Sequence, residues 1–166
     1  MQLIFLFETN SKSESDYKYV RSYLQTIKVE RKYKYSPIYL NGKGNYNKQE
    51  RNINAKIKRY DGISKVILFV DVDSTSLHYD QIKLNNEIIN YCNLKKYEIV
   101  WFKRTIEEVF LNKKIEHSQK TKMADDFLRK DEIKKVDYSK LSISKYENLK
   151  NGESNMKYVL DRILKN

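Results

Sequence analysis

The fold is decided by residues 66–73, which read VILFVDVD. Five consecutive apolar residues, rich in β-branched side chains and followed directly by acids, are typical of a strand that is buried on both faces. Strands of that kind lie at the centre of parallel sheets whose two faces are covered by helices. The segment therefore predicts an α/β protein that carries Asp71 and Asp73 at the carboxyl edge of its sheet.

The pattern on either side of this segment predicts the remaining elements. Short apolar runs predict three more strands, over residues 3–7, 35–40 and 97–102. Pro37, the only proline, places the second of these strands at an edge of the sheet. Apolar side chains at helical spacing predict the connecting helices, over about residues 14–28, 48–60 and 84–92. Alternating strands and helices with long connections predict a small parallel four-stranded sheet, Rossmann-like, with flanking helices and right-handed crossovers.

Two helix starts carry a capping signal. Ser13 stands three residues before Asp16, which predicts a capping box at the start of the first helix. Thr105 predicts the N-cap of a short helix after the fourth strand. From residue 113 onward the pattern becomes more polar and helical, and it ends in an amphipathic helix. We expect residues 1–112 to form the α/β domain and residues 113–166 to form a helical C-terminal extension that packs on it.

The composition bounds the class of partner and the compartment. The chain has 166 residues, a formal net charge of +11 and a sequence pI near 9.5. Such an excess of lysine and arginine favours a polyanionic partner, and we expect DNA or RNA. Cys92 is the only cysteine, which excludes an intrachain disulfide and favours a cytoplasmic location. No apolar run approaches the ~18 residues that span a bilayer, so no membrane partner is expected.

Acidic residues follow two of the predicted strands. Glu8 ends the first strand, and Asp71 and Asp73 end the third. Ligands of open parallel sheets bind at the carboxyl ends of the strands, and two aspartates two residues apart point the same way on a strand. Three carboxylates close together repel one another at neutral pH, and a divalent cation relieves that repulsion. Oxygen ligands without His or Cys favour Mg²⁺ or Mn²⁺ over zinc.

Together these features resemble the Toprim family, which includes topoisomerases, bacterial primases, small ribonuclease-maturation enzymes and several defence-associated nucleases. The shared pattern is an acid that ends the first strand, a polar stretch that leads into a helix, and an apolar strand that ends in Asp-x-Asp. In this chain the pattern comprises Glu8, Lys12, Glu14, Asp16, Asp71 and Asp73. The resemblance covers roughly residues 1–112 and implies a Toprim-like fold with a Mg²⁺ site.

The resemblance also implies a role for individual residues. In the family the glutamate does general acid/base work at the nucleotidyl group, and the Asp-x-Asp pair binds Mg²⁺. By position, Glu8 is the expected catalytic acid/base and a further metal ligand, and Lys12 is a catalytic residue at the phosphate. Asp71 and Asp73 are the expected metal pair. One departure is Thr9, which stands where the family usually has glycine.

A second stretch extends the resemblance. Residues 101–110, WFKRTIEEVF, resemble the region after the fourth strand in Toprim-like nucleases of bacterial defence systems, where a further acid joins the site. By this resemblance Glu107 is the first choice for an additional metal ligand, and Glu108 is the second. Lys103 and Arg104 would lie where the scissile phosphate binds, which makes them the expected nucleic-acid-binding residues.

We therefore expect a Mg²⁺-dependent nuclease, a hydrolase of nucleic-acid phosphodiester bonds, in phage defence or in a mobile element. The alternative is a catalytically inactive Toprim-fold adaptor or inhibitor that binds nucleic acid or a protein. A third interpretation, with Asp71 as a phosphoacceptor or phosphatase nucleophile, is disfavoured because no downstream Thr or Ser and Lys pair stands out. His78 and His117 are expected to be surface or core residues. The sequence does not determine whether the nucleic acid is DNA or RNA, or whether the chain forms a homodimer or binds a partner protein.

Overall fold

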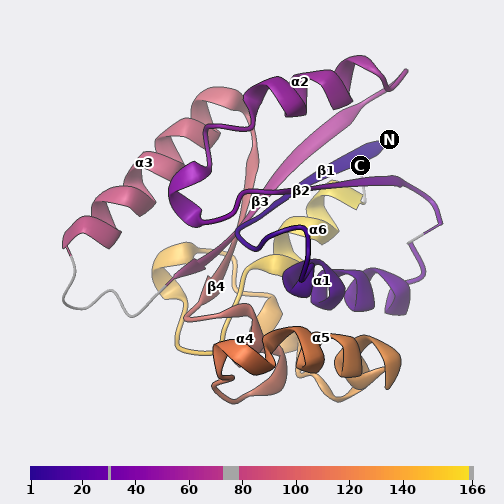
Figure 1. Cartoon of the computed structure of the whole chain (residues 1–166), viewed down its shortest axis with the longest axis vertical. Coiled ribbons are helices and arrows are strands. Elements are labelled where there is room, and N and C mark those ends of the chain that lie inside the picture. The colour runs from indigo at the N-terminus through magenta and orange to yellow at the C-terminus, as the bar shows by residue number, and fades with distance from the viewer. Residues whose placement is uncertain (30, 73–78, 165–166) are drawn as a thin grey trace.

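Four parallel strands form the sheet, in the order β2-β1-β3-β4 (Figure 1). The computed structural model describes residues 1–29, 31–72 and 79–164. The strands are β1 (Gln2–Phe7), β2 (Lys34–Tyr39), β3 (Ser64–Val72) and β4 (Glu98–Lys103). β2 pairs only with β1, so the predicted edge position of the strand that holds Pro37 is confirmed. The predicted small parallel four-stranded α/β fold is confirmed as well.

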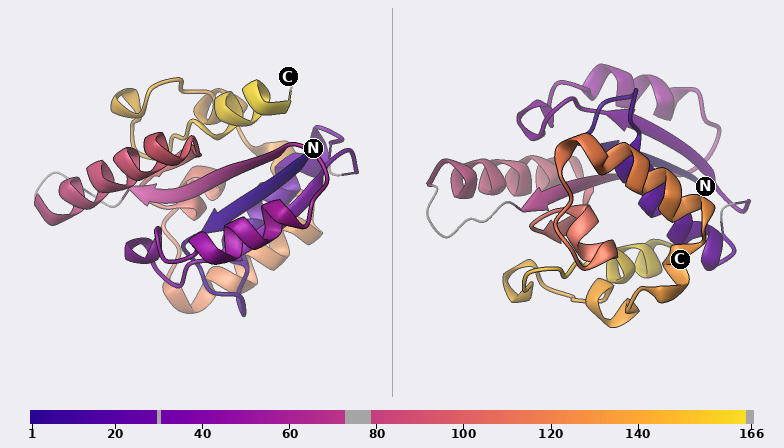
Figure 2. Two further views of the ribbon diagram at one scale, coloured as in Figure 1. Left: turned by 90° about the horizontal axis from the view of Figure 1, so that it is seen from above. Right: turned by 60° about the horizontal axis from the view of Figure 1, so that its bottom comes forward.

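Helices cover both faces of the sheet (Figure 2). The α-helices of the described residues are α1 (Ser15–Thr26), α2 (Glu50–Lys58), α3 (Tyr79–Lys95), α4 (Ile106–Leu111), α5 (Lys120–Arg129) and α6 (Met156–Leu164). Apolar side chains of α2 and α3 pack on one face of the sheet, and those of α1, α4, α5 and α6 pack on the other. None of these helices is both long and apolar enough to cross a membrane, within the part of the chain that the structure describes.

The alternation of side chains along the central strands builds the two cores. All six residues of β1 are buried. Phe5 and Phe7 point to the face of α1, where the Phe7 and Phe69 rings stack with centroids 4.7 Å apart. Leu6 and Leu68 point to the opposite face, below α2 and α3. A strand that is apolar on both faces therefore takes the central position that its composition predicts.

The C-terminal segment shares the core of the sheet. Phe127 of α5 and Leu160 of α6 are buried in the same cluster as Phe5 and Phe7, and the Phe127 ring lies 4.9 Å from that of Tyr19 in α1. The contact between α1 and α5 is visible at the bottom of Figure 1. The position of α5 is thus fixed by aromatic packing against α1 and α4.

The same segment covers the outer edge of β4. Ser154 forms an antiparallel bridge with Phe102. The Asn155 side chain accepts a hydrogen bond from the Trp101 amide at 2.7 Å and donates one to the Ile99 carbonyl at 3.1 Å. An open strand edge exposes unpaired backbone groups that can recruit other chains. Asn155 supplies partners for this edge in the way a neighbouring strand would.

The two capping predictions have different outcomes. The Thr105 side chain accepts a hydrogen bond from the Glu108 amide at 3.2 Å, so this N-cap is confirmed. The capping box at Ser13 is wrong, because α1 begins after Glu14, which has left-handed backbone angles and no side-chain cap. The loop is closed earlier, where the Asn10 side chain accepts hydrogen bonds from the amides of Lys12 and Ser13, each at 3.0 Å. An Asx turn of this kind competes with the capping geometry.

Candidate functional site

The candidate site lies where the order of the strands changes direction. From β1 the chain passes to β2 on one side, and it then crosses to β3 on the other side. The two crossovers place α1 and α2 on opposite faces, the arrangement in which ligands of open parallel sheets bind outside the carboxyl ends of the strands. Glu8 follows β1, and Asp71 lies near the end of β3. The Asp71 amide donates a hydrogen bond to Glu8 Oε1 at 2.8 Å, so the structure brings these two predicted site residues together.

Asp71 links the end of β3 to the start of α4. Its Oδ1 accepts a hydrogen bond from the Ile106 amide at 3.0 Å, at the first residue of α4. Burial raises the pKa of the Asp71 carboxyl well above its usual range, and the charges of Glu8, Asp16 and Glu107 raise it further. Asp71 is therefore surrounded by other carboxylates, which repel its negative charge.

Glu107 is completely buried on α4. One oxygen, Oε2, accepts a hydrogen bond from the Lys120 ammonium at 3.1 Å. The other oxygen, Oε1, has no hydrogen-bond partner among the described residues. Glu107 lies close enough to the other acids for its charge to act on Asp71 and on Asp16. Its role as a metal ligand stays a prediction, because the contact that the structure shows is with Lys120.

Two residues of this cluster received no role from the sequence. Asp16 lies in the first turn of α1 and is 8% exposed. Burial raises its pKa to about 7, the charge of Glu107 adds to the rise, and the charge of Lys120 opposes it. Asp16 was visible in the motif that follows Glu8, where its spacing indicated a helix start. Lys120 had no signal at all, because it reaches the site only through the packing of α5.

Lys120 is the cation at the centre of the acidic cluster. Its partial burial would lower the pKa of the ammonium, but the charge and hydrogen bond of Glu107 and the charges of Asp71 and Asp16 outweigh this, so the pKa is raised. The ammonium therefore stays charged at neutral pH, between the carboxylates and the pocket that Lys120 also lines.

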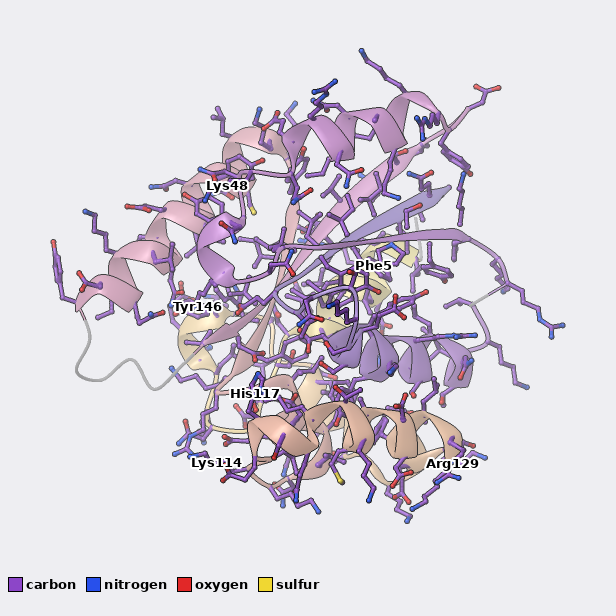
Figure 3. The ribbon with its side chains drawn as sticks, viewed as in Figure 1. Phe5, Lys48, Lys114, His117, Arg129 and Tyr146 are labelled. Carbon is purple, nitrogen blue, oxygen red and sulfur yellow. The ribbon has the colours of Figure 1, made fainter. Side chains whose placement is uncertain are left out.

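A pocket of about 540 Å³ opens beside this cluster. Its walls come from the loop after β1 and the start of α1, from the turn after β2, and from the N-terminal end of α5. The lining residues are Glu8, Thr9, Asn10, Lys12, Ser13, Ser15, Asn41, Gly42, His117, Lys120 and Thr121. His117 lies in the short helix before α5 (Figure 3) and lines the pocket, a position that the expectation of a surface or core residue did not include, whereas His78 lies outside the described residues. The N-terminal ends of α1 and α5 add partial positive charge.

The predicted basic residues differ in how they relate to the pocket. Lys12 is exposed and lines it. Lys103 and Arg104 are not among the residues that line it. The backbone of Lys103 pairs with Glu153 and Gly152, and Arg104 forms an ion pair with Glu108 at 3.3 Å. The role of Lys103 and Arg104 in nucleic-acid binding stays a prediction.

A lysine without a predicted role, Lys43, reaches the carboxyl edge of the sheet. Its Nζ donates a hydrogen bond to the Asp71 carbonyl at 2.8 Å.

The metal site is only partly described. Asp73, the expected partner of Asp71, lies outside the described residues. Among residues 1–29, 31–72 and 79–164, no three Asp, Glu, His or Cys side chains form a group that could hold a metal ion. The described part of the site therefore provides two neighbouring carboxylates, Glu8 and Asp71, beside a lysine-bound Glu107.

No family model, curated protein or solved structure matches this chain. The resemblance to the Toprim family therefore stays a prediction, and any functional conclusion depends on the geometry of the site.

Proposed function

We propose that this protein is a Mg²⁺- or Mn²⁺-dependent phosphodiesterase that acts on nucleic acid. The observation that carries the proposal is that carboxylates and lysine ammonium groups lie next to each other at the carboxyl edge of the sheet. The Glu8 carboxylate accepts a hydrogen bond from the Asp71 amide at the switch point of the sheet, its charge acts on the Asp71 carboxyl, and the adjoining pocket is lined by Lys12 and Lys120. A phosphodiester bound next to a divalent cation needs this combination, because the acids hold the metal and the cations hold the phosphate.

The donor set fits a hard divalent cation. Glu8 and Asp71 offer carboxylate oxygens, and Asp73 is the expected third ligand. The raised pKa of Asp71 reflects burial and the surrounding negative charge, which a divalent cation would offset. When bound, the metal would polarise a phosphoryl oxygen and stabilise charge on the leaving oxygen.

The chain's own groups have complementary tasks. Glu107 holds the Lys120 ammonium at the wall of the pocket, where the charge can neutralise a non-bridging phosphate oxygen. Residues at the starts of α1 and α5 line the same pocket, and the partial positive charge of a helix N-terminus favours an anion there. Glu8, which lines the pocket and accepts a hydrogen bond from the Asp71 amide, would move a proton at the reacting oxygens.

The test is cleavage of plasmid DNA and of RNA by the wild type and by Asp71→Asn, together with metal titration by calorimetry. Asparagine keeps the acceptor for the Ile106 amide, so the fold is preserved. We expect Mg²⁺-dependent cleavage to fall at least about a hundredfold, the size of losing one group that stabilises developing charge. Asp131→Asn changes an exposed aspartate in the turn after α5 that does not line the pocket; it is the matched control and should change cleavage less than twofold.

The melting temperature of the metal-free protein distinguishes loss of the metal site from misfolding of the Asp71→Asn variant. Asp71→Asn removes a repelled, partly buried charge, so in EDTA the variant should melt about 2–4 °C higher, which corresponds to about 1 kcal/mol. Added Mg²⁺ should raise the melting temperature of the wild type but not of the variant. Equal cleavage by both proteins, or an equal response to Mg²⁺, would show that Asp71 holds no catalytic metal.

A second function is favoured by two observations. The Lys120 ammonium already supplies a cation to the carboxylates, and Thr9 stands where the Toprim family usually has glycine. A lysine can balance the acids of a site that has lost its metal, which is the expected state of a non-catalytic nucleic-acid-binding adaptor or of a protein-binding inhibitor. Nucleic-acid binding without cleavage, unchanged by Mg²⁺ and by Asp71→Asn, would favour the adaptor.

A further inference from the structure

Helix α2 carries a set of cations that have no acidic partner. The helix buries Ile53 against the sheet and presents Arg51, Lys58 and Arg59 to solvent. Neither these three nor the half-buried Lys56 forms an ion pair within the described part of the chain. Nitrogen-tipped side chains project away from the sheet along this helix in Figure 3. The outer face of α2 is therefore a surface of uncompensated positive charge.

The opposite side of the molecule differs. Five of the six cations in residues 120–135, which comprise α5, the turn after it and the short helix η4 (Glu132–Lys135), contact a carboxylate. They are Lys120, Arg129, Lys130, Lys134 and Lys135, with Glu107, Asp126, Asp131 and Glu132 as partners. A high lysine content alone would give both faces the same character. The cations of α2 instead lack the acidic partners that most cations of residues 120–135 have.

The one acid of α2 does not cancel this surface. Glu50 accepts hydrogen bonds from Lys95 and Tyr91, both on α3. The hydrogen bond from Lys95 lowers the pKa of the Glu50 carboxyl, and that from Tyr91 adds to it. The charge of Glu50 is thus balanced within the molecule. Beside it, a groove of about 520 Å³ runs along α2 between Arg51, Asn54 and Lys58, which are one helical turn apart.

The outer face of α2 is connected to the candidate site through the turn before the helix. α2 follows the turn at the carboxyl end of β2 and precedes the amino end of β3, so it runs antiparallel to the strands. Lys43, in the turn before α2, contacts the carbonyl of Asp71, and the exposed Lys48 follows it (Figure 3). Nine helical residues extend about 13.5 Å, the distance covered by about four phosphates of one duplex strand.

We propose that the outer face of α2, with Arg51, Lys58 and Arg59, binds the sugar-phosphate backbone of nucleic acid and guides it to the carboxyl edge of the sheet. The inference rests on the proposed function, since it names the surface that holds the substrate of that site. Contacts of this kind position a strand without reading its bases, so affinity for different sequences should be affected equally.

The test measures binding of short fluorescent DNA and RNA oligonucleotides, single-stranded and duplex, in EDTA so that no cleavage occurs. The variant is Arg51→Gln/Lys58→Gln/Arg59→Gln. The control, Lys130→Gln/Lys134→Gln/Lys135→Gln, removes the same charge from exposed cations that already have acidic partners. Far-ultraviolet circular dichroism and melting curves verify that both proteins are folded.

We expect the α2 variant to bind at least about tenfold more weakly at physiological salt. Because each phosphate contact contributes about 0.7–0.9 to the slope of log affinity against log salt, the slope should fall by about 2–3. The control should stay within twofold of the wild type. Comparison of the four oligonucleotides identifies which form of backbone fits this face.

The outcomes keep the two proposals apart. Unchanged affinity and slope in the α2 variant, in a protein that still cleaves with Mg²⁺, would overturn this inference and leave the phosphodiesterase standing. Weaker binding in the α2 variant, in a protein that never cleaves, would support the surface and overturn the enzyme. Equal losses in variant and control would overturn the inference, because they indicate attraction by net charge rather than by α2.

Discussion

Substitution of Lys120 by methionine keeps the length of the side chain but removes the one hydrogen-bond partner that the Glu107 carboxylate has among the described residues. The Glu107 side chain is 0% exposed and that of Lys120 is 28% exposed, so the remaining carboxylate cannot reach bulk water. Removal of one member of a buried ion pair costs about 3–5 kcal/mol. We expect about 3 kcal/mol here because Lys120 is partly hydrated, which lowers the melting temperature by about 6–12 °C.

The assay is denaturant unfolding of Lys120→Met, of Glu107→Gln and of the double variant, each compared with the wild type. Glu107→Gln should cost only about 1 kcal/mol, since Lys120 then turns toward the pocket and water. The double variant has no buried charge, so it should be more stable than Lys120→Met alone.

The control lies two residues further along the same helix. Lys122 is exposed and has no ion-pair partner in the described structure, so Lys122→Met should change stability by less than about 0.5 kcal/mol. If Lys120→Met costs no more than Lys122→Met, or if the effects of the two site substitutions simply add, then Lys120 does not balance Glu107 and the account of the cluster is refuted.

Two more predictions follow from the described contacts. The pKa of Asp16 is about 7 in the folded chain and 3.8 ordinarily, so the folded state binds more protons between pH 4 and 7. Stability should fall as pH rises through this range, and Asp16→Asn should flatten that fall in urea unfolding; an unchanged slope would contradict it. Asn155→Ala leaves the Trp101 amide without its partner and should cost about 2 kcal/mol in thermal unfolding, whereas a loss below 0.5 kcal/mol would show that water replaces Asn155.

Much of the fold was predictable because the signals are local. A run of apolar, β-branched residues such as Val66 to Val70 satisfies the environment of a strand covered on both faces, whatever packs there. Helical spacing and long connections then require parallel strands, and the carboxyl ends of parallel strands share one edge. The proximity of Glu8 and Asp71 follows from this logic alone.

The start of α1 shows where local signals compete. Ser13 and Asp16 have the spacing of a capping box. The side chain of Asn10, which precedes them, instead accepts hydrogen bonds from the amides of Lys12 and Ser13. Both motifs are favourable in isolation. The Asx turn closes the loop after Glu8, so Asp16 enters the buried cluster instead of staying at a solvated helix start.

By itself, the sequence determined the order of strands and helices, the parallel sheet, and the edge at which Glu8 and Asp71 lie. Only the tertiary structure decided that Lys120 contacts Glu107 and that its charge acts on Asp16, because α5 is positioned by Phe127 against Tyr19 and Phe110, contacts without a local sequence signature. It also decided which cations stay unpaired on α2, since a charge in the sequence does not reveal its partner. Periodicity is local, whereas the balance of charges depends on residues brought together by packing.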